Sequence, residues 1–285
     1  ASSGGAQPNI SQGIIKEIRI PLPAVEEQRK IVEVLSTIDE TIRTTNEIIV
    51  KTELLKKSLM QELLTKGIGH KEFKYSEELG SEIPKEWAVV SLEEVIREAK
   101  SGFACGKRDE KGILQLRMNS IDTEGCIDIE GGVRVPVPRD VDEYLLRPGD
   151  ILFNNTNSVD LIGKTAIFRG EFPKCVYSNH LTRIRVNLGK VVPEWVLYVL
   201  VRKWQVGVPK AICHRHVHQA GINNQEIHRL KIALPPYSEQ QKITKVLSTA
   251  DVKLKLEKNE KTRLKEAKQG LMDLLLTGKI RIKVN

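Results

Sequence analysis

The sequence predicts an α+β fold in which one mixed α/β domain lies between two long helices. Three observations support this class: a repeat near both ends, a heptad pattern in each copy, and short β-rich runs between the copies. Residues 10–68 align to residues 222–280 without a gap, and 21 of the 59 positions are identical, whereas unrelated sequences match at roughly one position in fifteen. Two distant copies cannot form a solenoid, which needs adjacent repeats. We therefore expect a duplicated frame around an inserted domain.

Each copy of the repeat predicts one long helix after a proline-ended leader. The leaders read IRIPLP and KIALPP, and proline favours an extended segment because its ring fixes φ and removes an amide donor. Two glutamates suit the first turn of the first helix, and Ser238 with Gln241 forms a capping-box pattern at the second. Neither region contains proline, and one glycine falls inside the second. Helices of about 40 residues, or ~60 Å, are expected.

Both helices carry a heptad pattern that is apolar at its ends and polar in its middle. Positions that step by four and three lie along one side of a helix. Two matched copies most simply pack as an antiparallel coiled coil, against each other or against copies from a second chain. Ordinary bundle helices in one core are the alternative. The seam positions are Ile31, Leu35, Ile38, Ile42, Thr45, Ile49, Thr52, Lys56, Leu59 and Leu63, and in the second copy Ile243, Leu247, Ala250, Leu254, Glu257, Lys261, Leu264, Lys268, Leu271 and Leu275.

Residues 82–220 are expected to form one mixed α and β domain. Ser91 caps a short helix that runs to Lys100, and Pro193 begins an apolar helix that runs to Trp204. Glycine and aspartate turn signals separate short β-rich runs. These predicted strands cover residues 113–118, 133–137, 151–153, 165–168 and 181–186.

Composition narrows the class of protein. A net charge of +8 with an apolar content of 40% suits a globular protein that binds a polyanion; a solvated basic surface is the alternative. The apolar runs are far too short to span a bilayer, so we expect no membrane segment and a cytoplasmic location. The four cysteines form no CxxC pair, which argues against a zinc ribbon and a disulfide framework. We expect reduced thiols.

Polar side chains of the kind that contact nucleic acids gather in the predicted loops of the inserted domain. Arginine and lysine can fork to guanine, asparagine and glutamine can pair with adenine, and serine or threonine can contact bases or phosphate. We rank Lys107, Arg108, Asn154, Asn155 and His180 first as DNA contacts. Turn-forming asparagines are the alternative for the run after residue 153. The other candidates are Arg117, Asn119, Thr156, Asn157, Lys164, Arg183, His214, Arg215, His216 and Gln219.

No complete catalytic motif is present, so we predict no catalytic residue. Gly163, Lys164 and Thr165 resemble the end of a phosphate-binding loop, but Ser158 stands where the first glycine is needed. Histidines alternate in residues 214–218 and would face one side of a strand, yet the intervening arginine would lie unfavourably beside a metal cation. Contact with phosphate or base edges fits these histidines better, plain surface histidines are a close second, and no metal site is predicted.

In combination, these features resemble the specificity (S) subunit of type I restriction-modification systems. The leader LPxxxEQ(R/Q)KI occurs twice, each time before a long helix. The resemblance covers essentially the whole chain. Further matching segments are GSEIPKEWAVVSLEEV (80–95), YLLRPGDILFNNTNS (144–158), GKTAIF (163–168), SNHLTRIR (178–185) and QAGINNQEI (219–227).

The resemblance implies a non-catalytic subunit that recognises double-stranded DNA and directs a methyltransferase and endonuclease complex to a bipartite target. Such subunits usually carry two target-recognition domains, held apart by an antiparallel coiled coil that also binds the modification subunits. No cofactor is expected in this chain: the modification subunits bind S-adenosylmethionine to methylate adenine, and the restriction subunits join with ATP and Mg. A stand-alone DNA-binding regulator with a coiled-coil dimer arm is the alternative.

Only one complete target-recognition domain is recognisable, at residues 82–220. Residues 7–10 parallel residues 219–222, so residues 1–25 resemble the tail of another recognition domain and its proline leader. We expect either a half-subunit that self-associates through both helices or a fragment of a longer protein. The remaining expected parts are the long helices at 26–66 and 238–277, a linker at 67–81, the second leader at 221–237 and a tail at 278–285.

Overall fold

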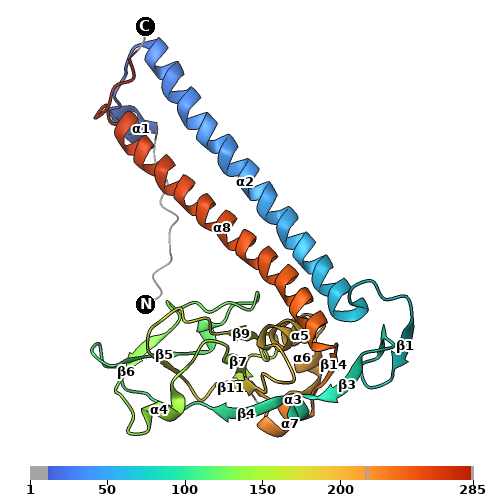
Figure 1. The fold of residues 1–285 in the computed structure, drawn as a ribbon. Helices are drawn as coiled ribbons and strands as arrows, with labels where there is room; N and C mark the ends of the chain where they lie inside the picture. The colour runs from blue at the N-terminus through green and yellow to red at the C-terminus, as the bar shows by residue number, and fades with distance from the viewer. Residues whose placement is uncertain (1–11, 216, 218, 284–285) are drawn as a thin grey trace. The chain divides into compact units, whose positions relative to one another are not determined.

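The computed structural model separates into two compact units. It describes residues 12–215, 217 and 219–283. The first unit, unit 1, consists of the described residues of Ala1–Glu53 and Val252–Asn285, and unit 2 is Leu54–Asp251. Two long helices contribute residues to both units (Figure 1). No described helix combines the length and apolar character needed to cross a membrane.

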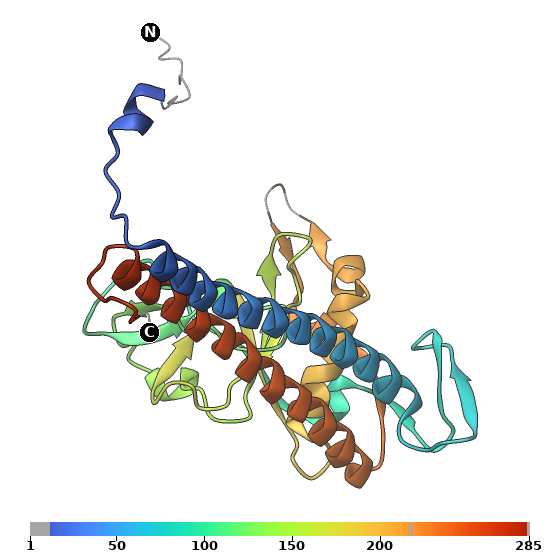
Figure 2. The same cartoon turned by 90° about the horizontal axis from the view of Figure 1, so that it is seen from above.

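Unit 1 is built around an antiparallel pair of helical segments. Lys268 Nζ lies 2.6 Å from Asp39 Oδ1, and Lys261 Nζ donates to Asn46 Oδ1 at 2.5 Å. Residue numbers fall on one helix as they rise on the other, so the segments are antiparallel, and both views show them side by side (Figures 1 and 2). The helices of this unit are α1 (Gln12–Glu17), the first part of α2 (Val25–Lys66) and the last part of α8 (Tyr237–Leu275).

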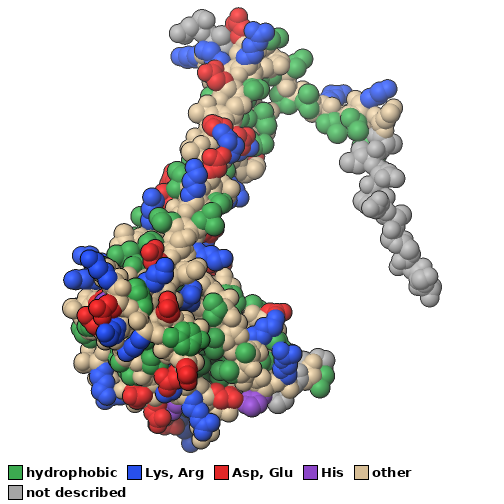
Figure 3. Space-filling view, turned by 90° about the vertical axis from the view of Figure 1, so that its right-hand side faces the viewer, with side chains coloured by type: hydrophobic (Ala, Val, Ile, Leu, Met, Phe, Trp, Pro, Cys, Tyr) green, Lys and Arg blue, Asp and Glu red, His purple; other side chains and the backbone are tan. Residues whose placement is uncertain are grey.

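The burial pattern of both long helices confirms the predicted heptad seam. Every seam position is buried or half-buried, including Thr45, Thr52 and Lys56 in the polar middle of α2. The positions outside the seam carry charges of both signs interspersed with apolar side chains (Figure 3). A seam that repeats every seven residues suits packing against a second helix, and the seam residues Lys56, Leu59 and Leu63 of unit 2 also contact the mixed α and β domain. The predicted fold class is therefore confirmed.

Unit 2 contains the mixed α and β domain. A four-stranded antiparallel sheet runs in the order β4-β11-β7-β9, and a three-stranded sheet runs in the order β10-β5-β6, with β10 parallel to β5. The strands of these sheets are β4 (Ile96–Ser101), β11 (Leu181–Val186), β7 (Ile151–Asn154), β9 (Thr165–Ile167), β10 (Cys175–Tyr177), β5 (Ile113–Leu116) and β6 (Val133–Val135).

Shorter elements complete unit 2. Two-stranded sheets join β1 to β2 and β14 to β3, and three short strands pair in the order β12-β13-β8. These strands are β1 (Phe73–Ser76), β2 (Ser81–Pro84), β3 (Ala88–Ser91), β14 (Lys231–Leu234), β8 (Thr156–Asn157), β12 (His214–Arg215) and β13 (Ala220–Gly221). The helices are α3 (Leu92–Val95), the 3-10 helix η1 (Met118–Ser120), α4 (Val141–Tyr144), α5 (Pro193–Gln205), α6 (Val208–Ile212) and α7 (Asn224–Arg229).

The core of unit 2 connects the β domain to the helical ends. The rings of Trp87 and Trp195 meet edge to face with centroids 5.6 Å apart, and neither residue is exposed. Met60 of α2, Ile184 of β11 and Leu247 of α8 belong to the same buried cluster. Fully burying side chains of this size stabilises by about 1.5–3 kcal/mol each. The ends of both long helices are thus fixed to the mixed α and β domain within this unit.

One predicted helix is wrong. The sequence pattern beginning at Ser91 suggested a helix to Lys100, but α3 ends at Val95 and the following six residues form β4. Glu94 caps the short helix by accepting from the backbone N–H of Ser91 at 2.7 Å. The chain then pairs antiparallel with β11, and this pairing with a strand distant in the sequence overrides the local helical preference.

The sequence repeat is also a repeat of contacts. Gln28 Nε2 donates to the carbonyl oxygen of Pro23 at 2.8 Å, and Gln240 Nε2 donates to that of Pro235 at 2.9 Å. Each residue of the second pair lies 212 positions after its counterpart. The same residues therefore fix the same turn between leader and helix in both copies.

Candidate nucleic-acid interface

A polar pocket forms where two parallel strands end together. Leu116 of β5 is paired with Tyr177 of β10, so the residues that follow both strands emerge at the same edge of the sheet. The pocket has a volume of about 360 Å³, which is at the small end of the range of roughly 300–1,000 Å³ for ligand sites. Its lining residues are Ala104, Cys105, Gly106, Gln115, Arg117, Met118, Asn119, Ser178, Asn179 and His180.

The loop at residues 102–106 is held against this edge by close backbone contact. A Cβ atom on Gly102 would lie 2.2 Å from the carbonyl oxygen of Tyr177, so only glycine allows the approach. Gln115 Nε2 donates to the carbonyl oxygen of Phe103 at 2.9 Å, and Arg117 donates to that of Cys105 at 3.1 Å. Side chains of the pocket therefore fix the wall that encloses it.

Several polar atoms at this pocket are buried without a partner among the described residues. They include Gln115 Oε1, Ser178 Oγ and His180 Nδ1. Asn154 Oδ1 is also unpartnered, while Asn154 Nδ2 donates at 3.4 Å to the carbonyl oxygen of the pocket residue Met118. Unsatisfied buried polar groups are costly and rare in folded proteins. Their concentration here indicates a site that is completed by a ligand.

Basic side chains lie in and beside the pocket and form what we call its basic mouth, and the acidic residues Asp109 and Glu110 follow them in the same loop. Lys107 and Arg108 are exposed in the loop that continues from its wall, and Arg117 is half-buried in its lining. Asn119 is exposed at the same edge. No aspartate or glutamate belongs to the lining. This arrangement suits an uncharged polar group inside and a phosphate outside. It gathers five residues that the sequence predicted as DNA contacts, the four named here together with His180.

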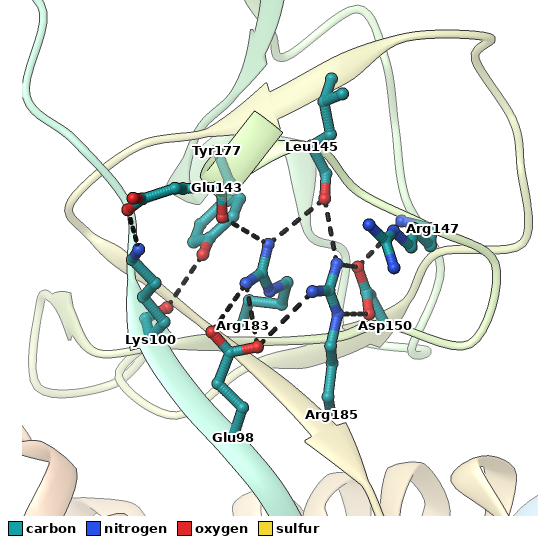
Figure 4. A network of polar contacts seen from close by, with 9 residues as sticks. All are labelled: Glu98, Lys100, Glu143, Leu145, Arg147, Asp150, Tyr177, Arg183 and Arg185. Atoms are coloured by element: carbon teal, nitrogen blue, oxygen red, sulfur yellow. Dashed lines mark hydrogen bonds and ion pairs between the residues drawn. The ribbon is translucent and has the colours of Figure 1, made fainter. Parts of the chain in front are cut away.

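Arg183 does not belong to this surface, which corrects its prediction as a DNA contact. It is 1% exposed, and its guanidinium donates to both carboxylate oxygens of Glu98 at 3.0 and 3.1 Å. It also donates to the carbonyl oxygens of Glu143 and Leu145 at 2.9 and 3.2 Å. Figure 4 shows this network. Both terminal nitrogens of Arg183 donate inside the protein, and Nε is buried without a partner among the described residues, so the guanidinium does not reach the surface.

The neighbouring Arg185 extends the same network. Its guanidinium contacts Asp150 at 2.7 Å, and this hydrogen bond raises the pKa of Arg185 although partial burial opposes it. Lys100 pairs with Glu143 at the edge of the network. These ion pairs join β4 and β11 to the chain around α4. They account for the basic residues on this sheet, which therefore need no role in binding nucleic acid.

Four further predicted contacts are buried and bonded within the domain. Asn154 is unexposed, Asn157 is 9% exposed, and the Oδ1 of Asn157 accepts from the N–H of Ser158 at 2.8 Å. Asn155 Nδ2 donates to Asn179 O at 3.1 Å and to a threonine hydroxyl. Lys164 donates to the carbonyl oxygen of Ile121, and burial lowers its pKa. The side-chain amides of Asn155 and Asn157 thus stabilise the strand end, as turn-forming asparagines would, whereas Asn154 Oδ1 has no partner among the described residues.

The remaining predicted residues form a second small cluster at the β12-β13-β8 sheet. His214, Arg215 and Gln219 are exposed, and Thr156 is half-buried on β8. His214 Nε2 lies 2.5 Å from Glu226 Oε1, so a carboxylate engages one nitrogen of this ring. His216 lies outside the described residues.

Gln115 is a site residue that the predicted set omitted. Gln115 lies in the strand ILQL between buried apolar neighbours, and it is unexposed. A lone polar side chain in such a strand is the signal that could have identified it, since burial of an amide needs a partner.

The fold and the repeat define a protein in which a mixed α and β domain is attached to a duplicated pair of long helices. Residues 1–54 and 84–266 match the family model described as the type I restriction modification DNA specificity domain. The chain belongs to this family, and the resemblance inferred from its motifs is confirmed.

Relatives of known name support the same family. The chain is 31% identical to the type I restriction enzyme MjaVIII specificity subunit of Methanocaldococcus jannaschii over 99% of this chain and 67% of that protein. It is 34% identical to the putative MjaX specificity subunit of the same organism over 69% of this chain and 47% of that protein. It thus spans about two thirds or less of these relatives.

Two solved structures share the fold. The HsdS subunit from Thermoanaerobacter tengcongensis gives a TM-score of 0.50 at 22% identity, covering 98% of this chain and 65% of that one. The S subunit of a type I restriction-modification system from M. genitalium gives a TM-score of 0.61 at 16% identity, covering 94% and 66%. Long helices beside a mixed domain are therefore the architecture of known specificity subunits.

Proposed function

We propose that this chain is the part of a type I specificity subunit that reads one half of a bipartite DNA target. The observation that carries the proposal is the basic mouth of the polar pocket, in a chain that belongs to the DNA specificity family. Lys107, Arg108 and Arg117 would position the phosphate backbone, while Asn119 and His180 would face the bases. The relatives are named specificity subunits of restriction enzymes, so the chain would direct catalysis by other subunits.

The partners follow from the same proposal. Modification subunits would bind the long helices and supply S-adenosylmethionine for adenine methylation, and restriction subunits would join with ATP and Mg. The helices would set the distance between two half-sites. The length of α2, 42 residues, corresponds to roughly 63 Å at ~1.5 Å per residue, which is enough to separate two readers along a duplex.

Replacing both Lys107 and Arg108 by alanine should weaken DNA binding without changing which sequence is preferred. Each lost phosphate contact should reduce the slope of log affinity against log salt by about 1. The target would first be identified by selection from a random duplex library, and affinity then measured by fluorescence anisotropy between 50 and 300 mM salt, a range of about sixfold chosen so that the slope is resolved.

The matched control replaces Lys74 and Lys85, two exposed lysines of the β1-β2 hairpin. This variant should keep the salt slope of the wild type. An equal loss in both variants would mean that only total charge matters and would contradict the proposed interface. If the chain alone binds its DNA target tightly, and the affinity does not increase when the modification subunit is added, the alternative of a stand-alone regulator is favoured.

A second recognition domain is indicated by the segment before α2. Ile15, Ile18 and Ile20 are 57%, 61% and 73% exposed. Their counterparts 212 residues later are Ile227, Leu230 and Ile232, which are 0%, 7% and 0% exposed. In the second copy these apolar residues pack into the recognition domain through α7 and β14. The exposed first copy would pack in the same way on another recognition domain of a longer protein, or against another apolar surface of a second chain, whose own recognition domain already holds residues 222–234.

This comparison predicts self-association of the isolated chain. The variant with Ile15 and Ile18 both replaced by aspartate should sediment as a monomer at concentrations where the wild type forms dimers, because it places charges in the apolar contact. Val32, 62% exposed on α2 outside this segment, provides the matched control as Val32→Asp. If the wild-type chain remains monomeric at high concentration, packing against a second chain is excluded. A longer protein would then have to supply the second recognition domain.

A further inference from the structure

The polar pocket presents acceptors whose chemistry selects its occupant. Gln115 Nε2 is engaged by the carbonyl oxygen of Phe103, so Oε1 is the atom left without a partner. Asn154 is outside the lining but bonds to the lining residue Met118: its Nδ2 donates to Met118 O, and its Oδ1 has no partner among the described residues. Amide oxygens only accept hydrogen bonds. They would repel a phosphate, and they require a ligand that donates.

Ser178 and His180 complement these acceptors. Ser178 Oγ can donate or accept, and His180 Nδ1 does either according to its tautomer. On their Watson–Crick edges adenine and cytosine offer the matching pattern, an exocyclic amino donor beside a ring nitrogen that accepts. Guanine also has an exocyclic amino group, but it presents a second donor, N1–H, in place of that acceptor. Thymine offers one N–H flanked by two acceptors and fits less well. The basic mouth at Lys107 and Arg117 would take the attached phosphate.

Burial decides how a base could reach these groups. Gln115 is 0% exposed and Ser178 is 4% exposed, so their polar atoms cannot touch the edges of bases that stay stacked in a groove. Side chains that read a duplex directly must project into it. A base that has turned out of the helix can enter a concave site, at the cost of unpairing and unstacking.

We propose that the pocket formed by Gln115, Ser178 and His180 binds one extruded adenine or cytosine of the DNA target. This deepens the proposed function and rests on it, because the base comes from DNA that the domain has bound. Recognition at that position would depend on the base being turned out, and other positions would be read by exposed residues such as Asn119.

The test uses the purified full chain, without other subunits, and the duplex selected as above. A mismatch is placed opposite each adenine and cytosine in turn, and the dissociation constant is measured by anisotropy. Because a mismatch removes the cost of unpairing, binding should tighten about tenfold at one position and weaken or stay constant elsewhere. The Ser178→Ala and His180→Phe variants should each weaken binding of that duplex by about fivefold, the effect of one lost hydrogen bond.

An abasic nucleotide at the same position separates a base contact from a general effect. Both variants should bind the abasic duplex as the wild type does, because no base remains to be held. Ser76→Ala, at a buried serine of β1 outside the pocket, is the matched control and should change neither duplex. Thermal unfolding of each variant checks that the fold is kept.

The outcomes distinguish this proposal from DNA recognition itself. The chain could bind the selected duplex tightly while no mismatch tightens binding, or the pocket variants could lose as much affinity for the abasic duplex as for the base-bearing one. Either result overturns the extruded base but leaves the proposed DNA interface in place. Binding of free dAMP or dCMP in a chain that binds no duplex would assign the pocket to a free nucleotide and overturn both proposals. Failure to bind either would also overturn both.

Discussion

Replacing Lys56 by alanine is expected to lower the free energy of unfolding of unit 2 by about 3–5 kcal/mol. Lys56 is 3% exposed on α2, and its Nζ lies 2.7 Å from Asp251 Oδ1 and 3.0 Å from Glu124 Oε2. Burial acts to lower the pKa of Lys56, but attraction by the two carboxylates outweighs it and raises the pKa. The amine is therefore charged, and its removal leaves Asp251 without a cation in a mostly buried site.

The repeat supplies a matched control for this prediction. Lys268 and Asp39 lie 212 positions from Lys56 and Asp251 and form the same pair in unit 1 at 2.6 Å. Their side chains are 29% and 55% exposed, against 4% and 15% for the buried pair. Exposed pairs contribute only about 0–1 kcal/mol, so Lys268→Ala should have a small effect. Identical chemistry in two environments isolates the contribution of burial.

Urea unfolding followed by tryptophan fluorescence would measure both variants, since Trp87 and Trp195 lie in the core of unit 2. Replacing Lys56 by methionine and Asp251 by leucine together should recover most of the lost stability, because two apolar residues carry no unpaired charge. Tyr198 donates to Asp251 at 2.6 Å and would lose that acceptor, so full recovery is not expected. Equal effects of Lys56→Ala and Lys268→Ala would contradict this account.

Replacing Arg183 by methionine is expected to destabilise the recognition domain by about 3–5 kcal/mol and to leave the DNA preference of the folded fraction unchanged. The substitution keeps most of the apolar stem and removes the guanidinium. Glu98 then loses the two hydrogen bonds from Arg183, and two backbone carbonyl oxygens lose their donor. The stability loss follows from these unpaired acceptors rather than from a missing DNA contact.

Arg108→Ala provides the contrasting measurement. Arg108 is exposed and forms no ion pair with the described residues. This variant should therefore unfold like the wild type, because surface substitutions usually change stability by less than about 0.5 kcal/mol, while its DNA affinity falls. Chemical unfolding and anisotropy on the same preparations would measure both quantities. An Arg183→Met variant that is as stable as the wild type and defective in binding would restore Arg183 as a DNA contact and contradict the structural assignment.

The sequence alone predicted the parts of this protein that depend on local or periodic patterns. The long helices begin at Val25 and Tyr237, one residue from their predicted starts, since proline leaders and first-turn acids are local signals. Burial along α2 and α8 follows the predicted heptad, because helical periodicity fixes which side chains share a face. The repeat and its flanking motifs also identified the family.

Other features depended on contacts between distant segments. β4 was predicted as helix because its pairing with β11 is not visible locally. The site was predicted only in part: Lys107, Arg108, Arg117, Asn119 and His180 gather at one edge because β5 and β10 are parallel.

Residues of the same type are buried in one place and exposed in another, and no local sequence pattern predicts which. Arg117 lines an open pocket while Arg183 is buried on Glu98. Lys56 and Lys268 occupy equivalent positions of one repeat, yet only Lys56 is enclosed by the recognition domain. The sequence by itself determined the helices, their seam and the family. Tertiary structure decided which polar groups find partners inside and which remain for a ligand, because burial and hydrogen-bond supply are set by segments far apart in the chain.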